Sequence, residues 1–233
     1  RGAMGIVYKG REPKLNRLTA IKTIRFIDEF DDDQAEIIKE HFYHEAEVVA
    51  KLSHPNIVTV FDVGEDLDLS YLAMEYLEGR GLDKFTRPVH LLDLGRCLDI
   101  VIQVCDALAY AHDHDIIHRD IKPSNILFGE GNNAYLADFG IAKACGRLQV
   151  TRKGQLKGKL PYMAPEQVEG TPADARTDIW ALGTILYEMV TGHRAFDAAS
   201  TVSLVGAILE REPAPLKERQ PLTPPSLQRL VRR

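Results

Sequence analysis

Acidic, basic and amide side chains gather in two short stretches near the middle of the chain. The first stretch is His118-Arg119-Asp120-Ile121-Lys122-Pro123-Ser124-Asn125, and the second is Asp138-Phe139-Gly140. Carboxylate and amide oxygens, such as those of Asp138 and Asn125, are hard ligands that Mg²⁺ accepts while it keeps water and phosphate oxygens in its shell. Taken singly, each of these residues is more often a turn residue or a solvated side chain. Only the combination of the two stretches indicates a site.

A third motif, Ala164-Pro165-Glu166, follows the first two, and chance does not explain the order and spacing of all three. With these motifs the sequence resembles the protein kinase family, in its serine/threonine branch. Lys122 favours that branch over the tyrosine kinases. The stretches 138–142 and 163–167 are most similar to bacterial kinases of eukaryotic type.

The resemblance implies a role for each polar residue of the motifs. Phosphoryl transfer disperses negative charge, so the enzyme mainly positions the reactants and neutralises that charge. Asp120 is expected to accept or orient the proton of the substrate hydroxyl, and Lys122 to place a cation at the γ-phosphate. Asn125 and Asp138 are the expected ligands of Mg²⁺, with Mn²⁺ as an alternative metal. His118 is expected in the core, without a part in proton transfer.

Residues near the start of the chain are expected to bind ATP. Gly2-Ala3-Met4-Gly5-Ile6-Val7 matches all but the first glycine of the family's phosphate-covering loop, and that glycine would precede residue 1. We therefore expect the chain to be cut there, and also at its end, which falls inside a helical pattern. The adenine ring is expected to contact a set of mostly apolar residues: Val7, Ala20, Met74, Glu75, Leu77 and Leu127. Among these, Glu75 to Leu77 would form the hinge whose backbone bonds to adenine.

The resemblance also implies an ion pair that orients the phosphates. Lys22 is expected to contact the α- and β-phosphates, and Glu45 to hold Lys22 in place. Glu45 is preferred over Glu47 because it shares the inward face of a predicted helix, whereas Glu47 is about 200° further round the helix. An apolar column is expected beside this pair, formed by Val49, Val60, His118 and Phe139 and anchored by Asp178.

A regulatory site is expected in the segment between Gly140 and Tyr162, where Thr151 is the one Ser or Thr. Related bacterial kinases often carry an activating phosphate at this place, and Arg119 could pair with it in a bidentate manner. A phosphate would also relieve repulsion within the basic stretch 147–153. The alternatives are an exposed threonine without a role and a basic surface that docks acidic substrates.

The sequence departs from the family pattern at Lys159. The family usually has Gly-Thr-x-x-Tyr where this chain has Gly158-Lys159-Leu160-Pro161-Tyr162. The usual threonine bonds to the catalytic aspartate and lysine and helps to select Ser and Thr hydroxyls. Lysine cannot accept a hydrogen bond, so this substitution bears on the choice of acceptor and on the shape of the loop.

The apolar pattern indicates the elements that position these residues. Strands are expected at 6–9, 18–24, 57–63 and 70–75, with one helix at 33–52. After a glycine-rich joint at 77–81 we expect helices at 91–113, 178–191 and 226–233 and short strands at 126–128 and 135–137. The prediction is an α+β fold with a β-rich kinase N-lobe of residues 1–76 and an α-rich C-lobe of residues 77–233.

The composition excludes some classes of protein. The 233 residues are 45% hydrophobic and 27% charged, as in ordinary soluble domains. The net charge of −5 provides no basic field for nucleic acid or an anionic membrane. No apolar run approaches the roughly 18 residues of a membrane helix, so we expect a cytoplasmic location, with any membrane tether outside this chain. Cys97, Cys105 and Cys145 are expected to be reduced, the first two in the core.

Two other functions remain open beside an active serine/threonine kinase. A pseudokinase would use the same fold as a binding or scaffold module, but such proteins usually lack one of the residues Lys22, Asp120, Asn125 and Asp138. A small-molecule phosphotransferase of related fold would lack the Ala-Pro-Glu segment. The expected partners are ATP and proteins with Ser or Thr acceptors, and autophosphorylation would involve transient self-association.

Overall fold

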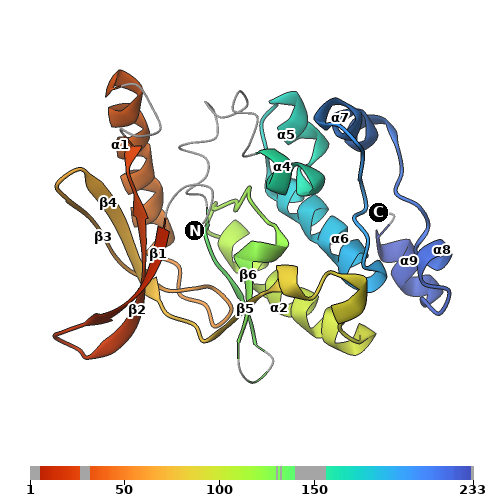
Figure 1. Ribbon diagram of the computed structural model, residues 1–233, viewed down its shortest axis with the longest axis horizontal. Helices are drawn as coiled ribbons and strands as arrows, with labels where there is room; N and C mark the ends of the chain where they lie inside the picture. The colour runs from red at the N-terminus through yellow and green to blue at the C-terminus, as the bar shows by residue number, and fades with distance from the viewer. Residues whose placement is uncertain (1–5, 27–31, 130, 132, 140–155, 232–233) are drawn as a thin grey trace.

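The computed structural model describes residues 6–26, 32–129, 131, 133–139 and 156–231. Figure 1 shows a β-sheet with one long helix at one end of the molecule and a group of helices at the other end. This arrangement confirms the predicted α+β fold. Among the described residues, no helix has both the length and the apolar character that crossing a bilayer requires.

The smaller part of the molecule is a four-stranded antiparallel sheet with one helix. The sheet has the order β1-β2-β4-β3, and its strands are β1 (Ile6–Glu12), β2 (Arg17–Ile24), β3 (Val60–Asp66) and β4 (Leu69–Glu75). The helix α1 (Asp32–Val49) buries Ile38, Phe42 and Ala46 in the apolar cluster that also contains Leu72 of the sheet. The alternating and helical patterns of the sequence predicted these elements because each element buries one side.

A second, three-stranded sheet begins within the predicted glycine-rich joint. Its order is β5-β6-β7, with β5 (Gly79–Gly81), β6 (Ile126–Gly129) and β7 (Ala134–Leu136). Gly79 pairs with Gly129, and a side chain at Gly79 would overlap the carbonyl group of Phe128. The glycines therefore serve close strand pairing within the joint, and the sequence analysis did not predict this strand.

The larger part of the molecule is built around the helices α2 (Leu94–His112) and α6 (Ala175–Thr191). Asp93 caps the start of α2, since its Oδ1 accepts a hydrogen bond from the N–H of Arg96 at 3.0 Å. Cys97 is buried on the inner side of α2, but Cys105 is exposed, which corrects the prediction that both are core residues. The remaining helices are η2 (Leu82–Lys84), η3 (Pro88–His90), η4 (Pro123–Asn125), α4 (Leu156–Lys159), η7 (Leu160–Tyr162), α5 (Pro165–Glu169), α7 (Thr201–Glu210), α8 (Leu216–Arg219) and α9 (Pro225–Val231).

Candidate active site

One buried carboxylate holds the loop that carries Asp120. Asp178, on α6, is fully buried, and its Oδ1 accepts a hydrogen bond from the N–H of Arg119 at 2.8 Å. Its Oδ2 accepts from the N–H of His118 at 2.8 Å and lies 2.8 Å from Nε2 of His112. Arg119 has a φ of 63°, a left-handed conformation that costs a non-glycine residue about 1–2 kcal/mol. The charge-assisted bonds to Asp178 offset that cost and fix the turn before Asp120.

His118 belongs to the core, as predicted. Its side chain is fully buried, Nε2 lies 3.0 Å from the carbonyl oxygen of Ala137, and its ring lies 4.6 Å from that of Phe139. Burial lowers the pKa of His118 despite the nearby carboxylates, so the imidazole is neutral at pH 7. Phe139 in turn shares an apolar cluster with Val49 and Val60. The four residues of the predicted column thus lie in one region of the core.

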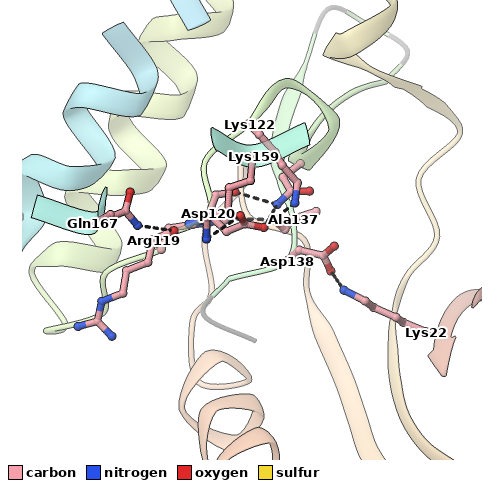
Figure 2. Close-up of polar contacts among 10 residues, drawn as sticks. Lys22, Arg119, Asp120, Lys122, Ala137, Asp138, Lys159 and Gln167 are labelled. Carbon is pink, nitrogen blue, oxygen red and sulfur yellow. Dashed lines mark hydrogen bonds and ion pairs between the residues drawn. The ribbon is translucent and has the colours of Figure 1, made fainter. Parts of the chain in front are cut away.

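Asp120 lies at the centre of a network of donors (Figure 2). Its Oδ2 lies 2.6 Å from Nζ of Lys122 and accepts a hydrogen bond from Nδ2 of Asn125 at 3.1 Å. Nδ2 of Asn125 also donates to the carbonyl oxygen of Asp120 at 2.9 Å. The other oxygen, Oδ1, lies 3.0 Å from Nζ of Lys159. Three residues that the sequence placed in one catalytic motif are therefore in contact, together with a lysine from α4.

The charge of Asp120 follows from two opposing effects. Burial would raise the pKa of this carboxyl group, but the ammonium groups of Lys159 and Lys122 outweigh burial and hold the pKa below its usual range. The carboxylate is therefore ionised at neutral pH. An ionised carboxylate can orient a hydroxyl group and receive its proton, which is the chemistry that a phosphoryl acceptor requires.

Lys22 and Asp138 come together from the two parts of the molecule. Nζ of Lys22, on β2, lies 2.8 Å from Oδ1 of Asp138, which follows β7, and Figure 2 shows the two side chains pointing toward each other. Asp138 has a φ of 63°, so the chain turns sharply at this carboxylate. The register of β1 and β2 places Val7 opposite Lys22, so the two side chains lie on the same face of the sheet.

The ion pair that the structure shows for Lys22 is with Asp138. Glu45 lies half-buried on α1, whereas Glu47 is exposed, in agreement with the inward face assigned from the helical pattern. The part of Glu45 in holding Lys22 stays a prediction.

The predicted metal ligands offer suitable oxygen atoms. The side chain of Asp138 is 33% exposed, so its carboxylate is accessible. Asn125 uses Nδ2 for its bonds to Asp120, which leaves its amide oxygen without a hydrogen bond from any described residue. The described residues contain no cluster of three or more His, Cys, Asp or Glu side chains suited to a metal. One carboxylate and one amide fit a magnesium ion that also takes phosphate oxygens and water.

Most of the predicted adenine contacts lie in one apolar cluster. Ala20 and Met74 are opposite each other in β2 and β4, and Leu77 and Leu127 pack against the same cluster. Val7 on β1 is 54% exposed, so it contributes an apolar surface rather than a core side chain. Ala20, Met74, Leu77 and Leu127 thus lie in one apolar region.

The connection between the two parts of the molecule has free backbone groups. The N–H of Glu75 donates to the carbonyl oxygen of Thr59 at 2.9 Å, so this donor is in use. The backbone of Leu77, two residues later, has no hydrogen-bond partner among the described residues. Leu77 can therefore offer a donor and an acceptor to the edge of a purine.

Three predicted site residues, Gly2, Gly5 and Thr151, lie outside the described residues. Arg119, the predicted partner of a phosphate on Thr151, lies next to Asp120. Its carbonyl oxygen accepts a hydrogen bond from Nε2 of Gln167 at 2.9 Å. Its Nε is buried and has no hydrogen-bond partner in the part of the chain that the structure describes. Arg119, in the catalytic loop of residues 118–125, thus has one donor without a partner among the described residues.

The sequence analysis missed the contact of Lys159 with Asp120. It identified Lys159 as a departure from the family pattern and considered only that lysine cannot accept a hydrogen bond. The charge of the side chain was the signal that could have revealed the contact, because an ammonium group beside a buried carboxylate pairs with it.

Comparison with known proteins agrees with this geometry. Residues 1–228 match the protein kinase domain family. The chain is 38% identical over 230 residues to the serine/threonine-protein kinase PrkC of Bacillus subtilis, covering 99% of this chain and 35% of that protein. It is 40% identical over 230 residues to a probable serine/threonine-protein kinase of Clostridium perfringens, covering 99% of the chain and 33% of that protein.

A probable serine/threonine-protein kinase of Clostridium acetobutylicum is 35% identical over 232 residues, which is 100% of this chain and 35% of that protein. The chain therefore spans about a third of the length of these curated relatives. The fold and the grouping of the motif residues agree with that family. The chain belongs to the protein kinase domain family, and these bacterial relatives are serine/threonine kinases.

Proposed function

We propose that the protein transfers the γ-phosphoryl group of ATP to Ser or Thr hydroxyls of proteins and acts in signalling. The observation that carries this proposal is the network at Asp120, in which one ionised carboxylate contacts Lys122, Asn125 and Lys159. The printed names of the relatives support Ser and Thr as acceptors. We keep residues 1–76 and 77–233 as the two lobes of this kinase domain.

The proposed step moves one phosphoryl group and one proton. The oxygen of the acceptor hydroxyl forms a bond to the γ-phosphorus while the bond from that phosphorus to the β–γ bridging oxygen breaks, and ADP keeps the electron pair. The hydroxyl proton passes to the carboxylate of Asp120. Lys122 places its charge beside this carboxylate. Lys22 would hold the α- and β-phosphates, with Glu45 as its proposed support.

Asn125 and Asp138 would hold the metal ion, for which we propose Mg²⁺ or Mn²⁺. When bound, the ion neutralises charge on the phosphates and fixes their position. The role of the chain is to present two hard oxygen ligands on a fixed backbone. Asn125 is fixed through its two bonds to Asp120, and Asp138 through its left-handed turn.

The adenine ring would lie against the apolar surface formed by Val7, Ala20, Met74 and Leu127, with its polar edge at Glu75–Leu77. Gly2 and Gly5 would cover the phosphates. The free backbone of Leu77 supports this placement, because a purine edge needs one donor and one acceptor. Nucleic acid and membrane lipid are not proposed as partners of this segment.

Regulation by phosphorylation is also part of the proposal. A phosphate on Thr151 would pair with Arg119, whose Nε is buried beside the catalytic loop without a described partner. The phosphate would come from autophosphorylation during transient self-association, in a cytoplasmic location.

The test is incorporation of labelled phosphate by the purified protein from γ-labelled ATP and Mg²⁺ into a generic basic protein. We expect transfer to Ser and Thr, identified by analysis of the phosphorylated residues. The Asp120→Asn variant should bind a fluorescent ATP analogue with unchanged affinity and transfer no phosphate. Binding without transfer by the unaltered protein would favour the pseudokinase alternative.

A further inference from the structure

The two oxygens of the Asp120 carboxylate have different partners. Oδ2 has two donors, Nζ of Lys122 at 2.6 Å and Nδ2 of Asn125 at 3.1 Å. A carboxylate oxygen has about two lone-pair sites, so Oδ2 is fully used. Oδ1 has one partner among the described residues, Nζ of Lys159 at 3.0 Å. Oδ1 is buried as well, so its ion pair with Lys159 fixes the orientation of the carboxylate.

The backbone of Lys159 is held by packing against α6 and α7 and not by the catalytic loop. It is the last residue of α4, and the next residue, Leu160, is buried in an apolar cluster with Phe196 and Leu204. Two residues further on, the hydroxyl group of Tyr162 donates to Oε2 of buried Glu188 at 2.7 Å. The backbone at Lys159 is thus anchored on α6 and α7, and the side chain extends from this anchor to Asp120.

The contact differs in kind from the one that a threonine makes. A hydroxyl group is a short neutral donor, whereas an ammonium group is a charged donor at the end of four methylene groups. Charge-assisted hydrogen bonds are about twice as strong as neutral ones. The side chain of Lys159 is 28% exposed and that of Asp120 is 7% exposed, so solvent screens the pair only in part.

We propose that Lys159 is a positioning residue for phosphoryl transfer, which holds the carboxylate of Asp120 in its orientation through this ion pair, at the position of the threonine of the family motif. This inference rests on the proposed kinase function. Lys159 acts through Asp120, and it has no described contact with Lys22 or Asp138, the residues proposed to hold the phosphates and the metal ion. Lys159 therefore affects the rate of transfer and not the binding of ATP.

The kinetic test compares Lys159→Met, which keeps the length of the side chain and removes its charge, with Lys159→Arg, which keeps the charge. We expect the Met variant to lose about 10- to 100-fold in kcat, because small misplacements of reacting groups cost this much. Its KM for ATP and for the acceptor peptide should stay at the values of the unaltered protein. The Arg variant should recover kcat to within about threefold. The control is Lys217→Met, an exposed lysine of α8, which should change neither constant.

A purely structural role would give a different result, in which KM for the acceptor rises and the Arg variant fails to recover kcat. A Met variant with unchanged kcat overturns the inference, and one with raised kcat shows an inhibitory contact instead. If the unaltered protein transfers no phosphate, the proposed function fails, and this inference fails with it. Transfer by the unaltered protein with an unchanged Met variant overturns this inference alone.

A second measurement does not depend on activity. Urea unfolding of the unaltered protein, Lys159→Met, Asp120→Asn and the double variant forms a cycle that isolates the interaction of the two residues. We expect Lys159→Met to shift the midpoint less in the Asp120→Asn background than in the unaltered protein. Equal shifts in both backgrounds would show that the two side chains do not interact, which overturns the inference.

Discussion

The ammonium group of Lys22 lies 2.8 Å from Oδ1 of Asp138, although the two residues are 116 positions apart in the sequence. This ion pair joins β2 of the small lobe to the segment after β7. The side chain of Lys22 is 13% exposed and that of Asp138 is 33% exposed, so the pair is only partly screened by solvent. The proposed phosphate-binding cation and the proposed metal ligand are therefore direct neighbours.

Replacement of Asp138 by Asn should abolish phosphate transfer while the fold is kept. The amide removes the negative charge that a magnesium ion needs, and such metal contacts supply several kcal/mol of the reduction in barrier. The measurement is incorporation of labelled phosphate, together with circular dichroism. Asp68→Asn is the matched control, since Asp68 is exposed in the turn between β3 and β4. Near-normal turnover by Asp138→Asn would contradict the metal assignment.

Lys22→Met should be inactive, and Glu45→Gln should lose a smaller factor in kcat. Lys22 would touch the phosphates, whereas Glu45 would only support Lys22, and an amide can do so in part. The double variant should be scarcely worse than Lys22→Met, because residues that act as a unit are not additive. Steady-state kinetics of the four proteins provide the comparison. Effects that multiply would show that Glu45 does not support Lys22, and Glu47 would be tested next.

Asp178→Ala should destabilise the protein more than Asp174→Ala does. Asp178 is fully buried and accepts hydrogen bonds from two backbone N–H groups, and loss of a buried charged acceptor costs about 3 kcal/mol. Asp174 caps the same helix from an exposed position. Urea unfolding, followed by circular dichroism, gives the free energy of unfolding of both variants. Equal losses would mean that Asp178 does not hold the catalytic loop.

Cys105 should react with iodoacetamide before Cys97 at pH 8. Cys97 is buried, and burial together with Asp93 raises its pKa to about 11, so the reactive thiolate is scarce well below that pH. Cys105 is exposed at the surface. Partial desolvation of its thiol and the negative charge of Asp106 also raise its pKa. Peptide mapping by mass spectrometry over time measures each rate. Faster modification of Cys97 would show that α2 opens readily, and reaction above pH 11 should reduce the difference.

Much of the fold could be predicted because burial leaves a periodic pattern in the sequence. The helix that carries Glu45 was predicted at 33–52 and extends over Asp32–Val49. The helix α7 was not predicted, although Ser200 caps its start by accepting a hydrogen bond from the N–H of Ser203 at 3.1 Å. The strand β5 could not be predicted, since its three residues carry no pattern and form a strand only through their pairing with β6.

The candidate site, like the fold, could be predicted only in part. Motif residues such as Asp120, Lys122 and Asn125 could be assigned because their spacing is specific to one family, and the structure places them in contact. The contact of Lys159 with Asp120 depends on how α4 lies against the catalytic loop, and no local pattern encodes that distance. Long-range contacts of this kind arise from tertiary packing, so the charge of Lys159 could suggest the pair but the sequence could not give its distance.

The position of Asp178 has a consequence for the order in which the protein is made. Asp178 lies 59 residues after Arg119, yet its carboxylate determines the left-handed turn of that residue. A chain emerging from the ribosome acquires Lys22, Asp120, Asn125 and Asp138 well before it acquires Asp178. Such a nascent chain has its principal reactive groups but lacks the carboxylate that arranges them. We therefore expect the turn at Arg119 to be fixed only after α6 has been synthesised and has folded.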